Sequence, residues 1–295
     1  MDKLISLQQY IDRMPEKQEN IYYLAGEDRD AMLKSPLLSR MLKEGIEVLL
    51  MDDPIDEFCM QHLAEFNKHK LQSAAKEGVD FDEDLTTKKK EAKVAKMYEP
   101  LVKWLKDVIG KEVEKVKISN RLTDIPCVIV SSQYGYSAQM EKVSRAQAFA
   151  NSEKTPSYQL SRKHFELNPY HPAIKTLLDK VVKAQEEETE VDDETRKQAM
   201  MLWDLAIVNS GFLIERTEQF TKEIERLVNY RLGLDPDAEN IEIEVDLDDD
   251  DDEEEEAVGD DAGEEAEDAS NEDNDGDDED APVGGEGSEK NESDL

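Results

Sequence analysis

The chain has 295 residues, of which 73 are acidic and 36 are basic, so its formal net charge is −37. Most of that charge lies in residues 235–295, which hold 32 acidic side chains and a single basic one, Lys290. This excess of negative charge argues against binding to the phosphates of nucleic acid, and no run of about 18 apolar residues predicts a membrane span.

The first 77 residues alternate between helical and extended patterns. Residues 4–14 have the spacing of an amphipathic helix and lack the continuous apolar stretch of a secretory signal. Two short apolar runs, IYYLAG (21–26) and GIEVLLM (45–51), are predicted strands, and residues 28–44 between them have helical spacing. This order predicts a small α/β layer with a partly parallel sheet.

Proline and capping residues indicate where the helices of the first 77 residues begin and end. The helical spacing before the second strand is interrupted at Ser35-Pro36. In DPIDEFCMQHLAEF (53–66), Asp53 is the expected N-cap and Pro54 the first helical residue. A helix over 53–66 is therefore expected to follow the second strand.

A strongly polar stretch, GVDFDEDLTTKKKEAK (78–93), marks the start of a second predicted domain at 78–234. A long helix should follow through 98–108, bent or broken near Pro100. The other elements expected before residue 185 are the strands VEKVKIS (113–119), CVIVSS (127–132) and HFELN (164–168), and a helix from Pro172 to Ala184.

Two helices, 195–213 and 217–232, are expected to close the folded part. The first is apolar on nearly every side, and the second carries one apolar stripe. A helix that is apolar all round needs partners on more than one face, so a second subunit is expected to supply some of them in a four-helix bundle. The residues expected to meet their symmetry mates are Leu202, Trp203, Ala206, Phe220, Ile224 and Leu227.

No residue pattern typical of catalysis or of a tight metal site is present. Cys59, His62 and His69 lie close in sequence, but neither C-x-x-C nor H-E-x-x-H occurs. The phosphate-binding loops G-x-x-x-x-G-K-[ST] and G-x-G-x-x-G and the G-x-S-x-G elbow are also missing. No catalytic residue and no cofactor is therefore predicted for this chain.

The acidic tail, residues 235–295, cannot bury enough surface to offset the loss of chain entropy and is expected to be disordered. It contains no complete calcium loop, so any calcium would be held weakly and at many carboxylates. The alternative is a solvated tail that only keeps the molecule in solution. The carboxylates expected to collect calcium include Asp246, Asp248, Asp249, Asp250, Asp251 and Asp252.

The stretch SSQYGYSAQMEKVSRAQAFA (131–150) begins with two tyrosines around Gly135 and continues as an amphipathic helix. Aromatic residues and methionine at helical spacing are typical of a core helix. The glycine-bearing segment before the helix and the adaptable side chain of Met140 favour an exposed binding surface instead. The residues alone leave both interpretations open.

Three long motifs resemble the 90-kilodalton heat-shock chaperones, and the similarity covers residues 7–236. They are YIDRMPEKQENIYYLAG, KSPLLSRMLKEGIEVLLMDDPIDEFCMQHLAEF and PCVIVSSQYGYSAQMEKVSRAQA. The resemblance implies a carboxy-terminal portion, in which 1–77 is the last α/β part of the middle domain and 78–234 is the dimerisation domain. The expected fold class is α+β: an α/β layer, a mixed domain with three strands and a closing helical bundle, and a disordered tail.

The resemblance also implies a function: a molecular chaperone fragment that forms homodimers and contacts unfolded client proteins and co-chaperones. ATP and magnesium would be used by a full-length relative and not by this chain. In the family, the segment matching 131–150 is an exposed loop and helix that touches clients, which favours exposure here. The client-binding residues implied are Tyr134, Tyr136, Met140 and Val143.

Two rival functions stay open: calcium storage by the tail, and a dimerisation scaffold without client contact. For the compartment, AKEGVDFDED (75–84) and LGLDPDAEN (232–240) are most similar to the endoplasmic-reticulum branch of the family. The cytoplasm is the alternative, although cytosolic members typically end in Met-Glu-Glu-Val-Asp. The chain ends instead in a sequence similar to a luminal retrieval address, Glu292, Ser293, Asp294 and Leu295.

Overall fold

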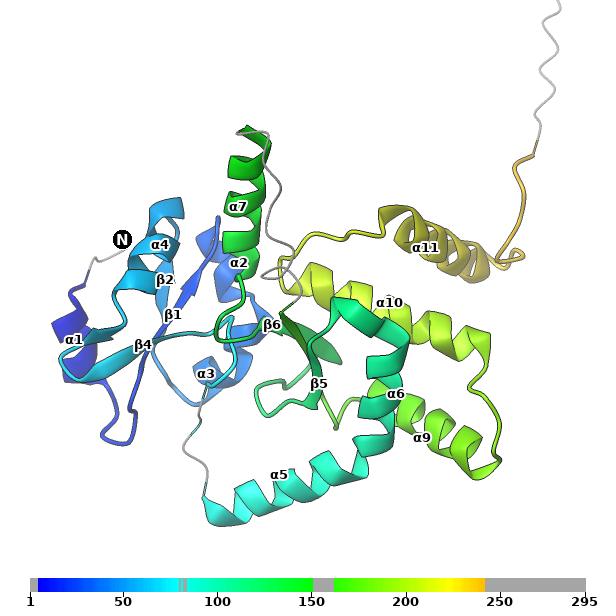
Figure 1. The fold of residues 1–295 in the computed structure, drawn as a ribbon, viewed down its shortest axis with the longest axis horizontal. Coiled ribbons are helices and arrows are strands. Elements are labelled where there is room, and N and C mark those ends of the chain that lie inside the picture. Colours follow the sequence, from blue (N-terminus) through cyan, green and yellow to red (C-terminus); the bar gives the residue numbers. More distant parts are fainter. Residues whose placement is uncertain (1–4, 80, 82–83, 151–161, 242–295) are drawn as a thin grey trace, which may run out of the picture. The chain divides into compact units, whose positions relative to one another are not determined.

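The computed structural model describes residues 5–79, 81, 84–150 and 162–241 (Figure 1). The helices are α1 (Leu7–Arg13), α2 (Arg29–Leu33), η1 (Pro36–Leu38), α3 (Ser39–Lys43), α4 (Pro54–His62), α5 (Leu85–Met97), α6 (Glu99–Ile109), η2 (Gly110–Glu112), α7 (Ala138–Ala150), α9 (Pro172–Glu186), α10 (Asp193–Asn209) and α11 (Thr217–Leu232). The strands are β1 (Ile21–Ala25), β2 (Leu49–Met51), β3 (Glu65–Phe66), β4 (His69–Ser73), β5 (Lys115–Ile118), β6 (Cys127–Ser131) and β7 (Lys163–Leu167). This mixture of helices and small sheets confirms the α+β class.

The first sheet has the order β2-β1-β4-β3, with β1 nearly buried along its whole length. β1 runs parallel to both β2 and β4, and β3 is antiparallel to β4. Parallel neighbours need crossover connections. The helices α2, η1 and α3 join β1 to β2, and α4 leads on to β3. The structure thus confirms the partly parallel sheet predicted from the sequence.

The helix starts predicted for the first 77 residues are present, but two strands, β3 and β4, were not predicted. The Ser35 side chain accepts a hydrogen bond at the start of η1, and the Asp53 side chain does the same at the start of α4. The helix predicted over 53–66 is wrong at its end, because α4 stops at His62 and β3 and β4 follow. Asn67 and Lys68 between these strands have φ of 48° and 71°, which is the backbone of a tight hairpin turn.

The polar stretch 78–93, predicted as a domain boundary, contains most of helix α5, a helix that was not predicted. The Asp84 side chain caps α5 by accepting from Thr87 N, and no residue of the helix is buried. Tyr98 separates α5 from α6, and Pro100 lies in the first turn of α6. The predicted break near Pro100 is therefore confirmed.

The second sheet has the order β5-β7-β6, so its central strand comes last in the sequence. β7 runs parallel to β5 and antiparallel to β6. The helices α6, α9 and α10 pack against one another, with α10 next to β6 and α6 next to β5. Their buried faces form one core cluster, which includes Leu101, Leu105, Cys127, Ile129, Phe165, Leu167, Ile174, Trp203 and Ala206.

β6 contributes to two cores because successive residues of a strand point to opposite faces. Cys127 and Ile129 belong to the cluster of the second sheet, whereas Val128 and Val130 belong to a second cluster. That second cluster also contains side chains from the first 77 residues, namely Tyr22, Leu24, Met32, Leu37, Leu38, Met41 and Ala74. β6 therefore joins the two sheets through buried apolar contacts.

Backbone hydrogen bonds tie the sheets together beside this cluster. Ser131 N donates to Ala75 O at 2.9 Å, and Glu77 N donates to Ser131 O at 2.8 Å. The described residues up to Ala238 belong to one compact unit. The predicted division at 77/78 falls inside this unit and stays a prediction.

Candidate functional site

A short connection between β6 and α7 holds the start of α7 in place. Ser137 Oγ donates to Glu57 Oε1 on α4 at 2.9 Å and also accepts from Met140 N. A Cβ atom on Gly135 would lie 3.0 Å from Arg162 O, so glycine permits the close approach of these two backbones. The predicted helix is present, and its first turn is fixed by α4.

The structure divides the predicted client-binding residues between core and surface. Tyr134 is 77% exposed, and Tyr136 and Val143 are partly buried. Met140 is only 7% exposed because it lies in the first turn, next to α4. The expectation that Met140 is exposed is therefore wrong, while client binding by the other three stays a prediction.

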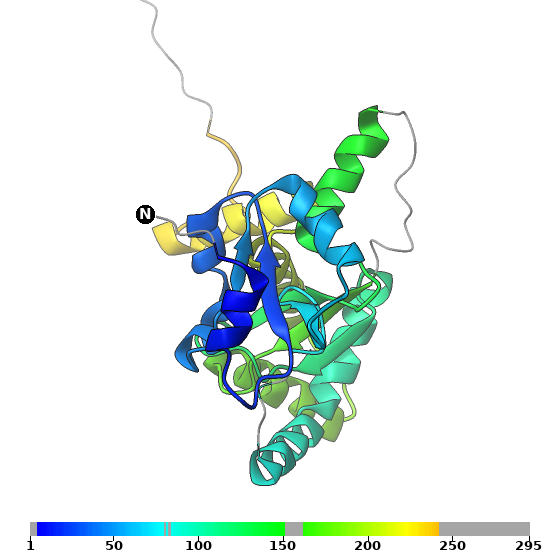
Figure 2. The same ribbon diagram turned by 90° about the vertical axis from the view of Figure 1, so that its left-hand side faces the viewer.

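The remainder of α7 extends away from both sheets (Figures 1 and 2). Glu141 anchors the near end: its carboxylate is buried and lies 3.0 Å from both Arg145 Nη2 and Lys163 Nζ. At the far end, Phe149 is 89% exposed. Phe149 is not among the client-binding residues predicted from the sequence, although an aromatic side chain near the end of an amphipathic helix is a signal for such a role.

The predicted dimer residues are likewise divided. Trp203 is 2% exposed and Ala206 is fully buried in the core of their own chain, so placing them at a dimer interface is wrong. The Trp203 ring meets Phe165 edge-on with centroids 5.3 Å apart, and its Nε1 donates to Glu112 Oε2 at 3.1 Å. Trp203 already has its partners within the chain.

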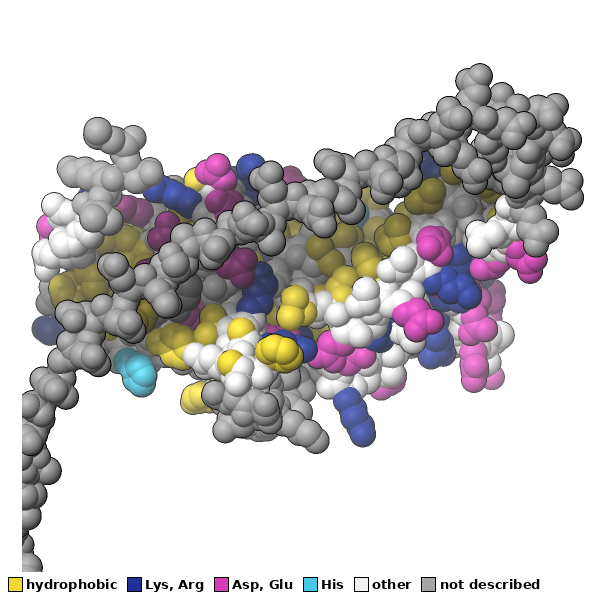
Figure 3. Space-filling view, turned by 90° about the horizontal axis from the view of Figure 1, so that it is seen from above, with side chains coloured by type: hydrophobic (Ala, Val, Ile, Leu, Met, Phe, Trp, Pro, Cys, Tyr) yellow, Lys and Arg dark blue, Asp and Glu magenta, His cyan; other side chains and the backbone are white. Residues whose placement is uncertain are grey.

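The side of α10 that faces away from the core, and most of α11, are not covered by other described residues of the chain. No residue of α11 is buried, and Figure 3 shows hydrophobic side chains reaching the surface between charged ones on the side facing the viewer. Ile224 is 38% and Leu227 44% exposed, while Leu202 and Phe220 are partly buried. The other exposed apolar side chains on these two helices are Leu205, Val208, Val228, Tyr230 and Leu232.

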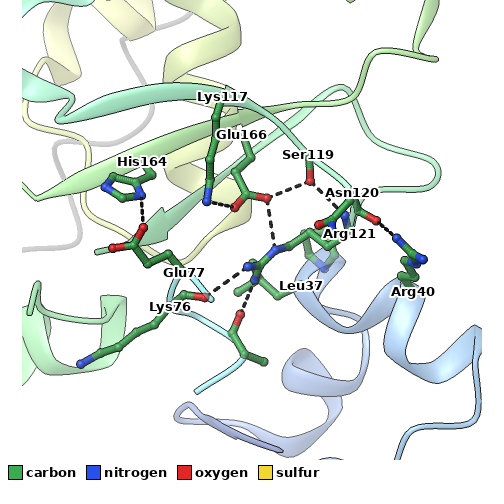
Figure 4. A network of polar contacts seen from close by, with 12 residues as sticks. Leu37, Arg40, Lys76, Glu77, Lys117, Ser119, Asn120, Arg121, His164 and Glu166 are labelled. Atoms are coloured by element: carbon green, nitrogen blue, oxygen red, sulfur yellow. Dashed lines mark hydrogen bonds and ion pairs between the residues drawn. The ribbon is translucent and has the colours of Figure 1, made fainter. Parts of the chain in front are cut away.

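A buried ion pair, which the sequence analysis missed, joins the two sheets (Figure 4). Arg121 Nε lies 3.1 Å from Glu166 Oε2, and both side chains are almost fully buried. The other guanidinium nitrogens of Arg121 donate to Ala74 O at 2.7 Å and to Lys76 O at 3.2 Å. One arginine thereby connects β7 to the chain segment that follows β4.

Two further groups complete the surroundings of Glu166. Ser119 Oγ donates to Glu166 Oε2 at 2.8 Å, and Lys117 Nζ lies 3.1 Å from Oε1. Burial raises the pKa of the Glu166 carboxyl, but Arg121, then Lys117 and Ser119, lower it further, so that its pKa lies below the ordinary value. Glu166 is therefore a buried carboxylate that stays charged.

His164 is a second buried ionisable group at this junction. Its ring nitrogens lie 3.3 Å from Glu77 Oε2 and 3.6 Å from Glu114 Oε2. Burial lowers the pKa of the imidazole, and the two glutamates only partly oppose that effect. The group connects the loop after β4 with β7, as Arg121 does.

The part of the chain that the structure describes contains no group of three metal-ligating side chains placed to hold an ion. The predicted calcium residues 246–252 and the terminal residues 292–295 lie outside the described residues. Burial raises the pKa of the Cys127 thiol to about 12, which leaves it protonated. Among the described residues, no helix is both long enough and apolar enough to cross a membrane.

Comparison with known proteins gives a family match over most of the sequence. The family described as "Hsp90 protein" matches residues 1–265. Similar proteins include an "Endoplasmin homolog" of Arabidopsis thaliana, 38% identical over 237 residues, which are 80% of this chain and 28% of the relative. A "Putative heat shock protein HSP 90-beta-3" of Homo sapiens is 38% identical over 229 residues, 77% of this chain and 37% of the relative. The chain thus spans about a third of the length of these relatives.

Proposed function

This chain belongs to the heat-shock protein 90 family, and from that premise we propose that it is a chaperone which dimerises through α10 and α11 and presents α7 to unfolded polypeptides. Membership of this family supports the proposed chaperone function. The placement of the two surfaces rests on the exposed apolar side chains of α7, α10 and α11.

Dimerisation is supported by the state of α11. This 16-residue helix has no buried residue, and Ile224, Leu227 and Val228 are exposed near the middle of it. A helix in a protein gains most of its stability from packing its apolar face against other elements. The described part of the chain covers little of the apolar face of α11. A second copy would supply the missing face in a four-helix bundle. The interface we propose excludes Trp203 and Ala206.

Ile224→Arg combined with Leu227→Arg should convert dimers into monomers. The two guanidinium groups would have to be buried without partners in the bundle, which is strongly unfavourable. Light scattering over a range of protein concentrations measures the result. A control variant, Glu218→Arg, places an arginine on the same helix away from Ile224 and Leu227 and should stay dimeric. Dimers in the first variant would exclude this interface.

Client contact is supported by two exposed aromatic side chains. Tyr134 precedes α7 and Phe149 lies near its end, and both are among the most exposed large side chains of the described residues. Exposed aromatic rings offer large apolar surfaces to a partner that contacts them. Since α7 extends away from the sheets, an unfolded polypeptide can reach them.

Tyr134→Ser combined with Phe149→Ser should weaken suppression of aggregation of an unfolded test protein. The variant should change the free energy of unfolding by no more than about 0.5 kcal/mol, because both side chains are exposed. Met140→Ala, by contrast, should cost about 2–5 kcal/mol as a core truncation. The control is Leu85→Ser with Tyr170→Ser, which removes two equally exposed side chains elsewhere. Equal loss of suppression in the control would refute a specific role for the α7 region.

For the compartment, we propose the lumen of the endoplasmic reticulum. The two relatives have the same sequence identity to this chain, so sequence identity does not distinguish between the two compartments. The sequences at 75–84 and 232–240 favour the endoplasmin branch, and a cytoplasmic location is the alternative. ATP use is proposed for the whole protein and not for residues 1–295, which contain no phosphate-binding loop. Weak calcium binding is proposed only for the acidic tail.

A further inference from the structure

A groove of about 910 Å³ lies between β4 and the connection that precedes α7. Its volume is near the upper end of the range for ordinary ligand pockets, so it has room for a short segment of polypeptide. Two tyrosines of the proposed client surface, Tyr134 and Tyr136, line one side. The other lining residues used below are Lys70, Leu71, Gln72, Lys76, Arg162 and Glu65.

The groove is basic, although the chain as a whole is strongly acidic. Lys70, Lys76 and Arg162 line it, against Glu65 as the only carboxylate among the described lining residues. Neither Lys70 nor Lys76 forms an ion pair within the described part of the chain. Glu65 lies opposite Lys70 in the β3–β4 pair, and Glu57 acts electrostatically on Lys76. Basic side chains still outnumber carboxylates among the described lining residues, so an incoming carboxylate would meet a net positive charge.

Lys76 is the stronger of the two candidates because it is partly buried. Its Nζ donates to Gln133 O at 3.3 Å, and an ammonium group has three protons to donate. Burial lowers the pKa of Lys76, and Glu57 only partly opposes that effect. In Figure 4 the Lys76 side chain points away from the Arg121–Glu166 pair. A partly desolvated ammonium with donors to spare gains more from a carboxylate than an exposed one does.

The remaining lining groups suit an extended polypeptide. The Gln72 amide nitrogen is already used, donating to Ser73 O and Glu77 O, which leaves its oxygen able to accept from a peptide N–H. The exposed Tyr134 ring and Leu71 offer apolar contacts close to the two lysines. A polypeptide that carries both apolar and acidic side chains could therefore use the ring and Leu71 for its apolar groups and the lysines for its carboxylates.

We propose that this groove binds an extended acidic segment of a client polypeptide, with one carboxylate on Lys76 Nζ, a second near Lys70, and an apolar side chain against Tyr134. This inference rests on the proposed chaperone function and adds the kind of segment that is selected. The negative charge of the rest of the chain opposes the approach of such a segment, so the contact depends on the local groove and weakens as salt rises.

The test uses the full chain and two short fluorescent peptides, one alternating glutamate with leucine and one with glutamine in place of every glutamate. Anisotropy should show the glutamate peptide binding at least about tenfold more tightly at low salt. Lys70→Gln combined with Lys76→Gln should abolish that preference, and Lys70→Arg with Lys76→Arg should retain it. Lys89→Gln with Lys93→Gln on α5 is the control for loss of two positive charges and should behave as wild type.

Equal affinity for the two peptides, or a preference that survives in the Lys70→Gln/Lys76→Gln variant, would overturn the proposal. Full displacement of the glutamate peptide by equimolar inorganic phosphate would also overturn it, since the groove would then select an anion and not a polypeptide. Aggregation suppression by the wild-type chain is measured in parallel. If suppression is present but peptide preference is absent, only the groove inference fails. If suppression is absent, the proposed function itself fails.

Discussion

Replacing Arg121 with methionine should lower the free energy of unfolding by about 3–5 kcal/mol, because the change leaves the buried Glu166 carboxylate without its main partner. It also leaves Ala74 O and Lys76 O without the donors they use in the native chain. Lys117 still reaches Glu166, but Lys117 is partly exposed and its attraction is screened by water. Denaturant unfolding at fixed protein concentration measures the loss.

Two companion variants test the cause. Lys117→Met removes the exposed partner of the same carboxylate and should cost no more than about 1 kcal/mol. Arg121→Met combined with Glu166→Leu removes both buried charges and should recover much of the stability. If Arg121→Met proves as mild as Lys117→Met, the buried pair is not what holds the two sheets together.

Unfolding as a function of pH tests the contribution of the Arg121–Glu166 pair independently. The pKa of Glu166 is lower in the folded chain than its ordinary value of 4.5, so its stabilising contribution is present above that pH. The contribution is lost as the pH falls through the folded pKa. In Arg121→Met the folded pKa should rise, and acid unfolding should therefore begin at higher pH than in the wild type.

Trp203→Ala should cost about 3–5 kcal/mol of protomer stability, as expected for removal of a large buried aromatic side chain. The substitution removes the contact with Phe165 and leaves the Glu112 carboxylate without the indole donor. It should not disrupt the proposed dimer at concentrations where the variant is folded, because Trp203 is covered by its own chain. Unfolding by fluorescence and light scattering on the same samples separate these two effects.

Leu205→Ala is the matched control on α10. Leu205 lies two residues further along α10 and is 39% exposed, so its truncation should change protomer stability little and should weaken dimerisation instead. A Trp203→Ala variant that is fully folded but monomeric would return Trp203 to the dimer interface and contradict its placement in the core.

The elements predicted well from the sequence are those whose signals are local. The proline of η1, the cap and proline of α4, and Pro100 in the first turn of α6 each limit the backbone within a few residues. β3, β4 and α5 were missed because they lack apolar periodicity: HKLQS is a polar strand, and α5 buries no residue. Their structure comes from strand pairing and from caps, which composition does not reveal.

The candidate surfaces could be predicted only in part, for a related reason. Periodicity shows that α7 and α10 have apolar faces, but it does not show which neighbour covers each face. Met140 and Trp203 were assigned to binding surfaces, although both are buried within their own chain. The Arg121–Glu166 pair could not be found at all, because its two members come together only once β5 and β7 are adjacent.

The position of β7 at the centre of the second sheet sets the order in which the chain can fold during synthesis. β5 and β6 do not pair with each other, so both lack a partner strand until residue 167 has been made. Val128 and Val130 of β6 also close the apolar cluster of the first sheet. That earlier sheet cannot complete its core while β6 is unpaired, and loop closure over such distances is slow. The apolar strands β5 and β6 therefore stay unpaired until late in synthesis, when β7 joins them.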